Sequence, residues 1–420
     1  MAGSASIRAA TRSCLAAERA SPSWRDFRAV AIVWSGWVVL MAGANLATPL
    51  YELYAERFGF SSLVLTSVFA TYAVVLVPGL VVFGRMSDRF GRRPVILAGL
   101  SVACAALLVF VFARDAAWLY GARALQGLAV AMISGAATAA LVELDPGDDR
   151  RRAALLAGLA QAGGGAAGPL LAGALAQWAP APLRLSFFVG IGATLAAGAL
   201  TLRLREESDR AREPWRFQRP RVPHALRSRF ARVSLTAATV WAAVALYLSI
   251  VPSYVGDLLE TDNLALLAAI SAIALVASCA TQILSERRHP STRLSQAAGL
   301  AILATGLLAL ALGGPSRSLP LLIAGSLLAG AGHGVAFLNA QEELNEMAPA
   351  DRRGEVTAAF ISCIYFLVAG SVVSTGLLDL RFSLSASVDA VSVALVASAL
   401  AAAVWQVRAE SRPQPRERTI

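Results

Sequence analysis

Long apolar runs alternate with short polar connections along almost the whole chain. A helix needs about 20 mostly apolar residues to cross a bilayer, and it must satisfy its own backbone hydrogen bonds because lipid offers no partners. Windows that meet this requirement fall at 29–51, 63–84, 94–113, 117–142, 153–178, 183–203, 233–257, 263–284, 296–314, 319–342, 355–378 and 385–406. The pattern predicts an all-α integral membrane protein with twelve transmembrane helices.

The longest polar connection, 204–232, divides these windows into two groups of six. It is rich in Arg and Pro, which argues against a packed core and for a cytoplasmic linker. The motif that begins at Glu143 recurs at Glu346, about 203 residues later. The same offset relates Gly127 to Gly330. The predicted organisation is two pseudo-symmetric six-helix halves between two cytoplasmic tails: tail 1–28, N-terminal half 29–203, linker 204–232, C-terminal half 233–406 and tail 407–420.

Composition excludes a soluble protein. The chain is 57% hydrophobic and 15% charged, whereas about a quarter of the residues of a soluble domain are charged. The formal net charge of +10 does not indicate nucleic-acid binding, because the cationic residues lie in short connections and not on one face of a domain. The three His and four Cys are scattered, so neither a metal site nor an enzyme is expected.

Arg residues are distributed unevenly between the two sides of the predicted bundle. With the N-terminus inside, roughly 31 Arg fall in cytoplasmic segments and about five outside. The five are Arg57, Arg114, Arg184, Arg317 and Arg381. Positive charge is retained on the cytoplasmic side during insertion, so both termini are expected to be cytoplasmic, with the protein in the inner (plasma) membrane.

The connection after the second window combines Gly, Asp and Arg in a specific order. It reads Gly84-Arg85-Met86-Ser87-Asp88-Arg89-Phe90-Gly91-Arg92-Arg93-Pro94. The order Gly, three residues, Asp, Arg, any residue, Gly, Arg, Arg resembles the signature of the major facilitator superfamily. The twelve-helix, two-half layout extends this resemblance over nearly the whole chain.

The resemblance implies the major facilitator fold and transport by alternating access at a site between the halves. In that family the Asp and Arg of the signature hold the cytoplasmic ends of the halves together. Carried over, Asp88 would face the start of the eleventh helix near Gly354, and Arg92 would join this charge cluster. The rest of the predicted gate is Gly84, Arg89, Gly91 and Arg93. The corresponding connection of the second half, 285–290, lacks the glycines and the Asp, so the gate is expected to be asymmetric.

Arg123 lies well inside the fourth window. An intramembrane charge costs at least ~2.5 kcal/mol on insertion scales, so it needs a polar cavity or a partner. Together with Gln126 and Gly127, Arg123 resembles the family's fourth-helix motif, which implies a role in proton coupling. The alternative is a structural Arg that binds backbone carbonyls of the first helix.

The fifth window contains a glycine-rich segment interrupted by a proline. Gly164, Gly168, Pro169 and Gly173 resemble the antiporter motif of drug-efflux members, although Ala172 stands where that motif has a glycine. Small residues four apart allow close helix packing, and the proline bends the helix. The resemblance is to the twelve-helix drug:proton antiporter branch and favours export.

Proton coupling requires a titratable group within or near the membrane. The first window offers none before Glu52, near its outer end. Asp257 and Asp389 are further candidates, and a solvated residue at the membrane boundary is the alternative for each. His333 is the only His inside a window and would suit a proton-linked step, unless it simply packs and binds a carbonyl.

Aromatic and amide side chains of several windows would line the substrate cavity if helical phase turns them inward. They are Asn45, Tyr51, Tyr72, Gln161, Trp241, Tyr247, Tyr254, Asn339 and Tyr365. Such a lining suits an amphipathic organic solute better than a sugar phosphate.

The sequence therefore favours a monomeric secondary transporter, driven by the proton gradient without a bound cofactor, that exports small, largely hydrophobic compounds. An uptake symporter or facilitator of a metabolite on the same scaffold is the second hypothesis. A membrane sensor or membrane enzyme is the third, and the short connections leave no room for a sizeable soluble domain.

Overall fold

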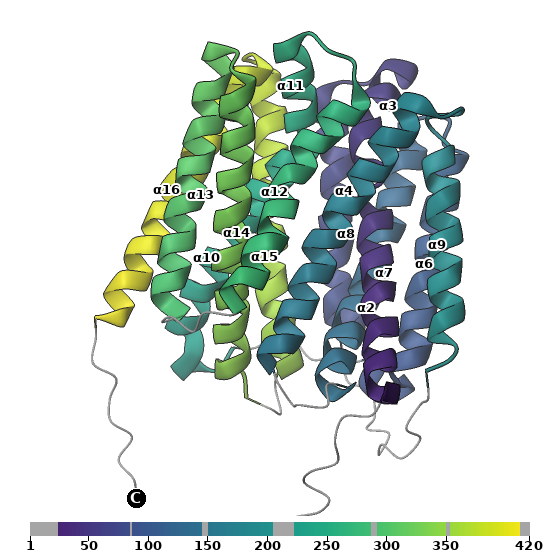
Figure 1. The fold of residues 1–420 in the computed structure, drawn as a ribbon, viewed down its shortest axis with the longest axis vertical. Helices are drawn as coiled ribbons and strands as arrows, with labels where there is room; N and C mark the ends of the chain where they lie inside the picture. Colours follow the sequence, from purple (N-terminus) through teal and green to yellow (C-terminus); the bar gives the residue numbers. More distant parts are fainter. Residues whose placement is uncertain are drawn as a thin grey trace, which may run out of the picture.

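The computed structural model describes residues 24–84, 86–144, 150–204, 222–286, 292–349 and 353–411, and these ranges contain helices and no strand (Figure 1). The elements of the N-terminal half are α2 (Trp24–Asn45), η1 (Thr48–Leu50), α3 (Tyr51–Phe58), α4 (Ser62–Phe83), α5 (Met86–Phe90), α6 (Arg92–Val111), α7 (Ala116–Leu144), α8 (Arg150–Trp178) and α9 (Leu185–Thr201). Those of the C-terminal half are η2 (His224–Leu226), α10 (Arg227–Ser249), α11 (Val251–Leu259), α12 (Leu264–Glu286), α13 (Thr292–Ser316), α14 (Leu319–Met347), α15 (Arg353–Asp379) and α16 (Leu384–Glu410).

Every predicted window corresponds to a helix. Within the described ranges, eleven helices are long and apolar enough to cross a membrane, and the shorter apolar helix α9 makes a twelfth. α9 has 17 residues, which is the lower limit of about 17 for a span. The predicted all-α membrane fold is confirmed.

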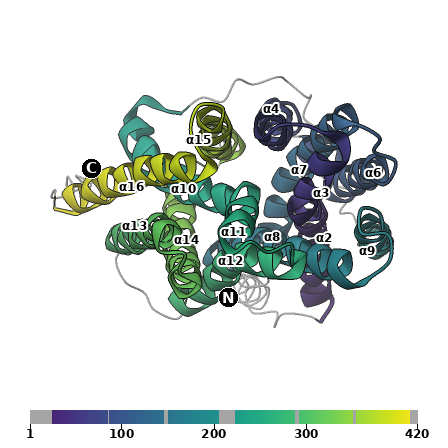
Figure 2. The same cartoon turned by 90° about the horizontal axis from the view of Figure 1, so that it is seen from above.

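The two halves lie side by side when the bundle is viewed from above, with α8 and α12 near the middle (Figure 2). The same neighbour relations recur in each half. In the first half α7 packs against α4 and α6, and in the second half α14 packs against α12 and α13. A parallel repeat about an axis along the membrane normal produces this arrangement.

Gly127 and Gly330 occupy equivalent positions in this repeated packing. A Cβ at Gly127 would overlap the carbonyl of Tyr72 in α4, and a Cβ at Gly330 would overlap the carbonyl of Ala274 in α12. Each glycine therefore lets two backbones approach more closely than any other residue would allow.

The first helix of each half is interrupted near the end of the bundle opposite the start of α2. We name this end the outer end, and the opposite end the inner end, because the distribution of Arg predicts that orientation. α2 gives way to η1 and α3 around Pro49, and α10 gives way to α11 at Pro252. Proline cannot donate a backbone hydrogen bond, so a continuous helix is disfavoured at both points. The short helices α3 and α11 that follow lie together at the end of the bundle opposite the start of α2 (Figure 1).

Two helix pairs make most of the contact between the halves, α8 with α12 and α4 with α15, and α8 also contacts α14. Near the outer end, the backbone N–H of Leu264 donates to Gln177 Oε1 at 2.9 Å. On the second pair, a Cβ at Gly376 would lie 3.0 Å from Thr66 Cβ. Residues that line these two seams are the ones that can respond to movement of one half against the other.

Candidate functional site

The signature connection folds as a short helix followed by a glycine hinge. Gly91 adopts φ 91°, a left-handed value that favours glycine, directly before α6 begins at Arg92. Arg92 Nη2 lies 2.8 Å from Glu143 Oε1 at the end of α7, and Arg92 also donates to Ser87. Arg93 Nη1 donates to the carbonyl of Leu204 at 3.4 Å. These contacts join the connection to other elements of its own half.

The predicted contact of the signature across the two halves falls outside the described side chains. Asp88 lies in α5, but neither its side chain nor the surroundings of Gly354 are described. Arg89 is exposed and its guanidinium lies over the Phe90 ring, 5.3 Å from the centroid. Gly84 ends α4, and a Cβ at Gly135 of α7 would lie 3.0 Å from the Gly84 carbonyl oxygen. The gating role of the connection stays a prediction.

Arg123 is buried, with 3% of its surface exposed, and it binds the broken end of α2. Its Nη1 donates to the Ala44 carbonyl at 3.0 Å and to Gln126 Oε1 at 2.9 Å, and its Nη2 donates to the Phe69 carbonyl at 3.2 Å. Gln126 Nε2 in turn donates to the Gly43 carbonyl at 3.0 Å. Carbonyls at a helix C-terminus lack intrahelical partners and favour a cation, so Arg123 and Gln126 cap α2.

This geometry matches the structural alternative for Arg123, in which the side chain binds carbonyls of the first helix. The guanidinium also faces two aromatic rings. Its Cζ lies 4.8 Å from the Phe69 centroid and 4.7 Å from the Tyr72 centroid, as in cation–π contacts. Tyr72 in turn contacts Tyr365 of the other half.

Tyr72 and Tyr365 meet across the two halves. Their hydroxyl oxygens are 3.2 Å apart and their rings are edge to face, with centroids 5.6 Å apart. Both were predicted to line the substrate cavity, and the structure brings them together at the contact between α4 and α15. In this conformation the two rings pack against each other between α4 and α15.

The glycines of the fifth-helix motif face two different partners. A Cβ at Gly164 would lie 2.5 Å from Met41 Cβ, and a Cβ at Gly168 would overlap the Ala42 carbonyl, so both pack on α2 of the same half. Gly173 faces the other half, because its Cβ would overlap Ala268 of α12. Pro169 lies inside α8 without ending it.

His333 belongs to an aromatic and polar cluster within the C-terminal half. Its Nδ1 is 2.8 Å from Ser278 Oγ, which accepts from Gln282 Nε2 at 3.0 Å. The imidazole meets Trp241 edge to face at 4.9 Å and stacks on Phe337 at 5.4 Å. The predicted cavity residue Trp241 is thus placed beside His333, both of them away from the Arg123 cap.

The remaining predicted cavity residues do not meet at one site. The amides of Asn45, Gln161 and Asn339 donate to carbonyls four residues earlier in their own helices. Tyr51, Tyr247 and Tyr254 are fully buried in the helix packing. The structure therefore groups three of the nine, Tyr51, Tyr72 and Tyr365, around Arg123 and one, Trp241, around His333.

Glu52 is a candidate carboxylate at the contact between the halves. It is in α3, its neighbours include Ser253 and Asp257 of α11, and a Cβ at Gly256 would lie 4.0 Å from its Oε2. Asp257 is exposed, whereas Asp389 is half-buried in α16. Glu52 and Asp257 are thus neighbours across the two halves, whereas Asp389 lies in α16 of the C-terminal half.

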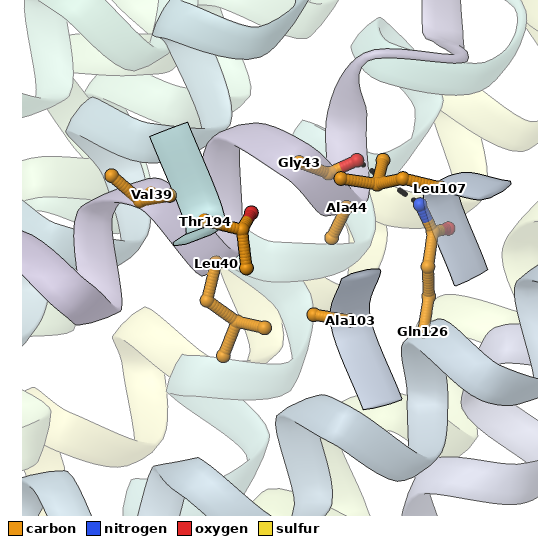
Figure 3. Close-up of a pocket in the computed structure, with 8 residues that line it drawn as sticks. All are labelled: Val39, Leu40, Gly43, Ala44, Ala103, Leu107, Gln126 and Thr194. Atoms are coloured by element: carbon orange, nitrogen blue, oxygen red, sulfur yellow. Dashed lines mark hydrogen bonds between the residues drawn. The ribbon is translucent and has the colours of Figure 1, made fainter. Parts of the chain in front are cut away.

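A small pocket lies inside the N-terminal half, between α2, α6, α7 and α9 (Figure 3). Its lining is Val39, Leu40, Gly43, Ala44, Ala103, Leu107, Gln126 and Thr194. The hydrogen bond from Gln126 to the Gly43 carbonyl closes one side of it (Figure 3). The pocket adjoins the cap of α2 and does not open between the two halves.

Sequence reasoning missed a buried ionic network at the inner end of the C-terminal half. Glu343 is fully buried, and its Oε1 lies 2.5 Å from Arg232 Nη2 and 2.8 Å from Arg229 Nε. Gln296 Nε2 donates to Glu343 Oε2 at 2.7 Å, and Gln406 Nε2 donates to Gln296 Oε1 at 2.6 Å. The network joins α10, α13, α14 and α16. Its members lie at the ends of the apolar windows. Sequence alone does not distinguish a charged residue there from an ordinary solvated residue at the membrane boundary.

Comparison with known proteins identifies the family. Residues 33–374 match the family model described as Major Facilitator Superfamily. The chain belongs to this superfamily. A solved structure of a superfamily transporter, the human organic anion transporter MFSD10 (TETRAN), superposes with a TM-score of 0.70 at 17% identity over 91% of this chain and 99% of that one. At this identity the likeness concerns the fold alone.

Curated relatives include proteins named for efflux, export or drug resistance. The chain is 29% identical to a multi-drug resistance efflux pump PmrA homolog of Lactococcus lactis, over 42% of this chain and 44% of that protein. It is 27% identical to the bacillibactin exporter of Bacillus subtilis, over 34% and 37% of the two chains. It is 34% identical to the puromycin resistance protein pur8 of Streptomyces alboniger, over 34% and 30%. Each match spans less than half of the relative's length.

Proposed function

We propose that this superfamily transporter is a proton-coupled exporter of small, largely hydrophobic organic compounds, working by alternating access between its two halves. The observation that carries the proposal is the convergence of two motifs on one turn of α2. Arg123 and Gln126 of α7 bind the carbonyls of this turn, and Gly168 of α8 packs against it. The first resembles the family's fourth-helix motif, the second resembles the antiporter motif of drug-efflux members, and both contact the same turn.

The proposed coupling runs through the break between α2 and α3. Glu52 lies in α3 just beyond the break and faces α11 of the other half. A proton from outside neutralises Glu52 and removes the charge that opposes its burial against α11. The resulting shift of α3 reaches the capped end of α2 and the Arg123 guanidinium, and so biases the contact between α4 and α15.

Two features support a hydrophobic organic substrate. The groups that meet between the halves at Tyr72 and Tyr365 are aromatic rings with hydroxyls, and the groups around His333 are aromatic rings and an amide. Apolar walls with a few placed polar groups bind amphipathic solutes. The efflux relatives agree with this direction of transport.

Uptake of a small metabolite, by symport or facilitation, is the second candidate. It is favoured by Ala172 in place of a motif glycine and by the lack of a carboxylate in the first predicted window, 29–51. Growth of a deletion strain on single nutrients separates it from export, because an exporter is dispensable for growth on them.

We also propose an inner-membrane location with both termini in the cytoplasm, and function as a monomer driven by the proton gradient alone. The excess of Arg in the segments assigned to the cytoplasm supports the orientation. Cysteine labelling of intact cells against inverted vesicles, with single Cys placed in the tails, tests it.

The deciding experiment measures proton movement in proteoliposomes under an imposed pH gradient, with a panel of hydrophobic cations, antibiotics and metabolites. Wild type is compared with Glu52→Gln and with Glu56→Gln, a control one turn along α3. Proton flux that depends on an added compound, is lost in Glu52→Gln and persists in the control supports the proposal. Compound movement with no proton flux would refute proton coupling.

A further inference from the structure

An ion pair crosses between the halves at the inner end of the bundle, on the seam of α8 with α12 and α14. Arg151 Nη1 of α8 lies 3.3 Å from Glu342 Oε1 of α14, and Arg151 Nη2 donates to the Ser285 carbonyl of α12 at 3.0 Å. The two side chains are only 16% and 17% exposed. One guanidinium thus holds two helices of the other half.

Arg151 lies where its charge destabilises its own helix. It is the second residue of α8, where the positive end of the helix dipole repels a cation. Ser285 is in the last turn of α12, where free carbonyls and the negative end of the dipole attract one. The charge therefore destabilises the start of α8 and stabilises the contact between the halves.

The partner carboxylate is fixed by its neighbour in the chain. Glu343 follows Glu342 and is held by Arg232, Arg229 and Gln296 inside the C-terminal half. Consecutive helical residues point about 100° apart, so one carboxylate is anchored within its half while the other reaches the opposite half. The buried network sets the position from which Glu342 meets Arg151.

We propose that Arg151 and Glu342 form a second inner latch, separate from the signature connection, and that Glu343 is its positioning residue. The signature connection lies next to α4 and α6, whereas the latch closes the seam of α8 with α12 and α14. Release of the latch opens that seam toward the inner side. The inference goes beyond export and coupling, but it rests on the proposed alternating access.

A native thiol reports on this seam. Cys279 of α12 lies beside α8, with its Sγ 3.8 Å from where a Cβ of Gly163 would be, about two turns from the latch. In a protein whose other cysteines are replaced (Cys14→Ser, Cys104→Ala, Cys363→Ser), a charged maleimide modifies Cys279 only when the seam admits water. The rate is measured on purified, folded protein without substrate or proton gradient.

We expect Arg151→Gln and Glu342→Gln each to raise the labelling rate about five-fold or more, because the rate follows the population of the open seam. Arg152→Gln removes the same charge one residue on, from a side chain over Phe27 of its own half, and should stay within about two-fold of wild type. Glu343→Gln should raise the rate although Arg151 and Glu342 are both present.

Charge reversal tests the pair directly. Arg151→Glu and Glu342→Arg alone should label fast, and the double reversal should return toward wild type. Wild-type rates in both neutral variants, or a double reversal that labels as fast as either single one, would overturn the latch. Glu342→Asp keeps the charge with a shorter reach and should give an intermediate rate, which provides a probe if a neutral variant does not fold. Since neither substrate nor protons are added, failure here is distinct from failure of the exporter proposal.

Discussion

Single glycines decide where the helices of this protein can approach one another. Gly127 and Gly330 each face a backbone carbonyl of a neighbouring helix, and the space there does not admit a Cβ. The neighbour at each point is main chain, which cannot rotate away as a side chain can. Their role is thus steric and local.

Gly127→Ala should lower the free energy of unfolding by about 1–3 kcal/mol, because the new methyl group would force α7 away from α4. Gly121 lies in the same helix with nothing within 4 Å of its would-be Cβ. Gly121→Ala should therefore leave stability unchanged or raise it by up to ~1 kcal/mol. Thermal unfolding of the two variants in detergent compares them, and equal stability would contradict the packing.

Two roles are open to Arg123, capping of α2 and proton coupling. Measuring the unfolding temperature and the proton flux of the same variants separates them. Arg123→Gln should destabilise the protein by about 1.5–3 kcal/mol, because charged hydrogen bonds to the Ala44 and Phe69 carbonyls are lost. Arg123→Lys keeps the charge but lacks the fork that reaches both carbonyls, so it should fall between Gln and wild type. A Gln variant with wild-type unfolding temperature and no proton flux would mean that the residue serves coupling alone.

At the scale of elements, α8 packs against α2 of its own half and against α12 and α14 of the other half. Gly164 and Gly168 are four residues apart and face α2, whereas Gly158, seven residues before Gly165, shares with it the face toward α12. The helix therefore presents one small-residue face to its own half and another to the opposite half.

Three consecutive glycines of α8 offer a matched series. Gly164→Ala should be costly, by about 1–3 kcal/mol, since the Val38 carbonyl and Met41 are in the way. Gly165→Ala should cost less, because the nearest atom to the new Cβ is the end of the Leu275 side chain at 2.9 Å, and the Asn45 amide lies 4.0 Å away. Gly163→Ala meets Cys279 at an ordinary 3.8 Å and should be neutral or mildly stabilising. Unfolding temperatures that rank in another order would contradict the assigned faces.

The helices could be predicted from the sequence because length and hydropathy decide them, and even the windows with Arg123 and His333 form helices. The helix breaks at Pro49 and Pro252 were not predicted, since both prolines lie inside apolar windows. The fifth-helix motif was read as one unit, but helical rotation turns Gly173 toward a different partner from Gly168. Which way a side chain faces depends on helix packing, and a single sequence does not contain that information.

At the scale of the whole molecule, contacts between the halves occur at three levels. The hydrogen bond from Leu264 to Gln177 lies near the outer end, the Tyr72–Tyr365 pair lies midway, and Arg151 meets Glu342 at the inner end. Contacts at all three levels describe an arrangement in which the halves meet on both sides. This explains why the predicted cavity residues do not line an open site.

Cross-linking the outer part of the α4–α15 seam should stop transport. In a cysteine-free background, Thr66→Cys with Gly376→Cys should form a disulfide, because a Cβ at 376 lies 3.0 Å from Thr66 Cβ and a slight separation brings the pair into range. Turnover should fall more than about ten-fold on oxidation and recover on reduction, as expected if the seam must open. Each single Cys variant is the control, and full activity of the oxidised pair would show that this seam stays closed during transport.

The equivalent helix breaks at Pro49 and Pro252 bear on how the two halves evolved. Pro49 and Tyr51 recur as Pro252 and Tyr254 at the same offset as Gly127 and Gly330. If the halves descend from one duplicated six-helix ancestor, that ancestor already had an interrupted first helix and a close glycine contact. The Arg123 cap, the Gly168-Pro169 motif and the Arg151–Glu342 pair occur in one half or between the halves. They are the features by which the two halves, built on one helical plan, differ from each other.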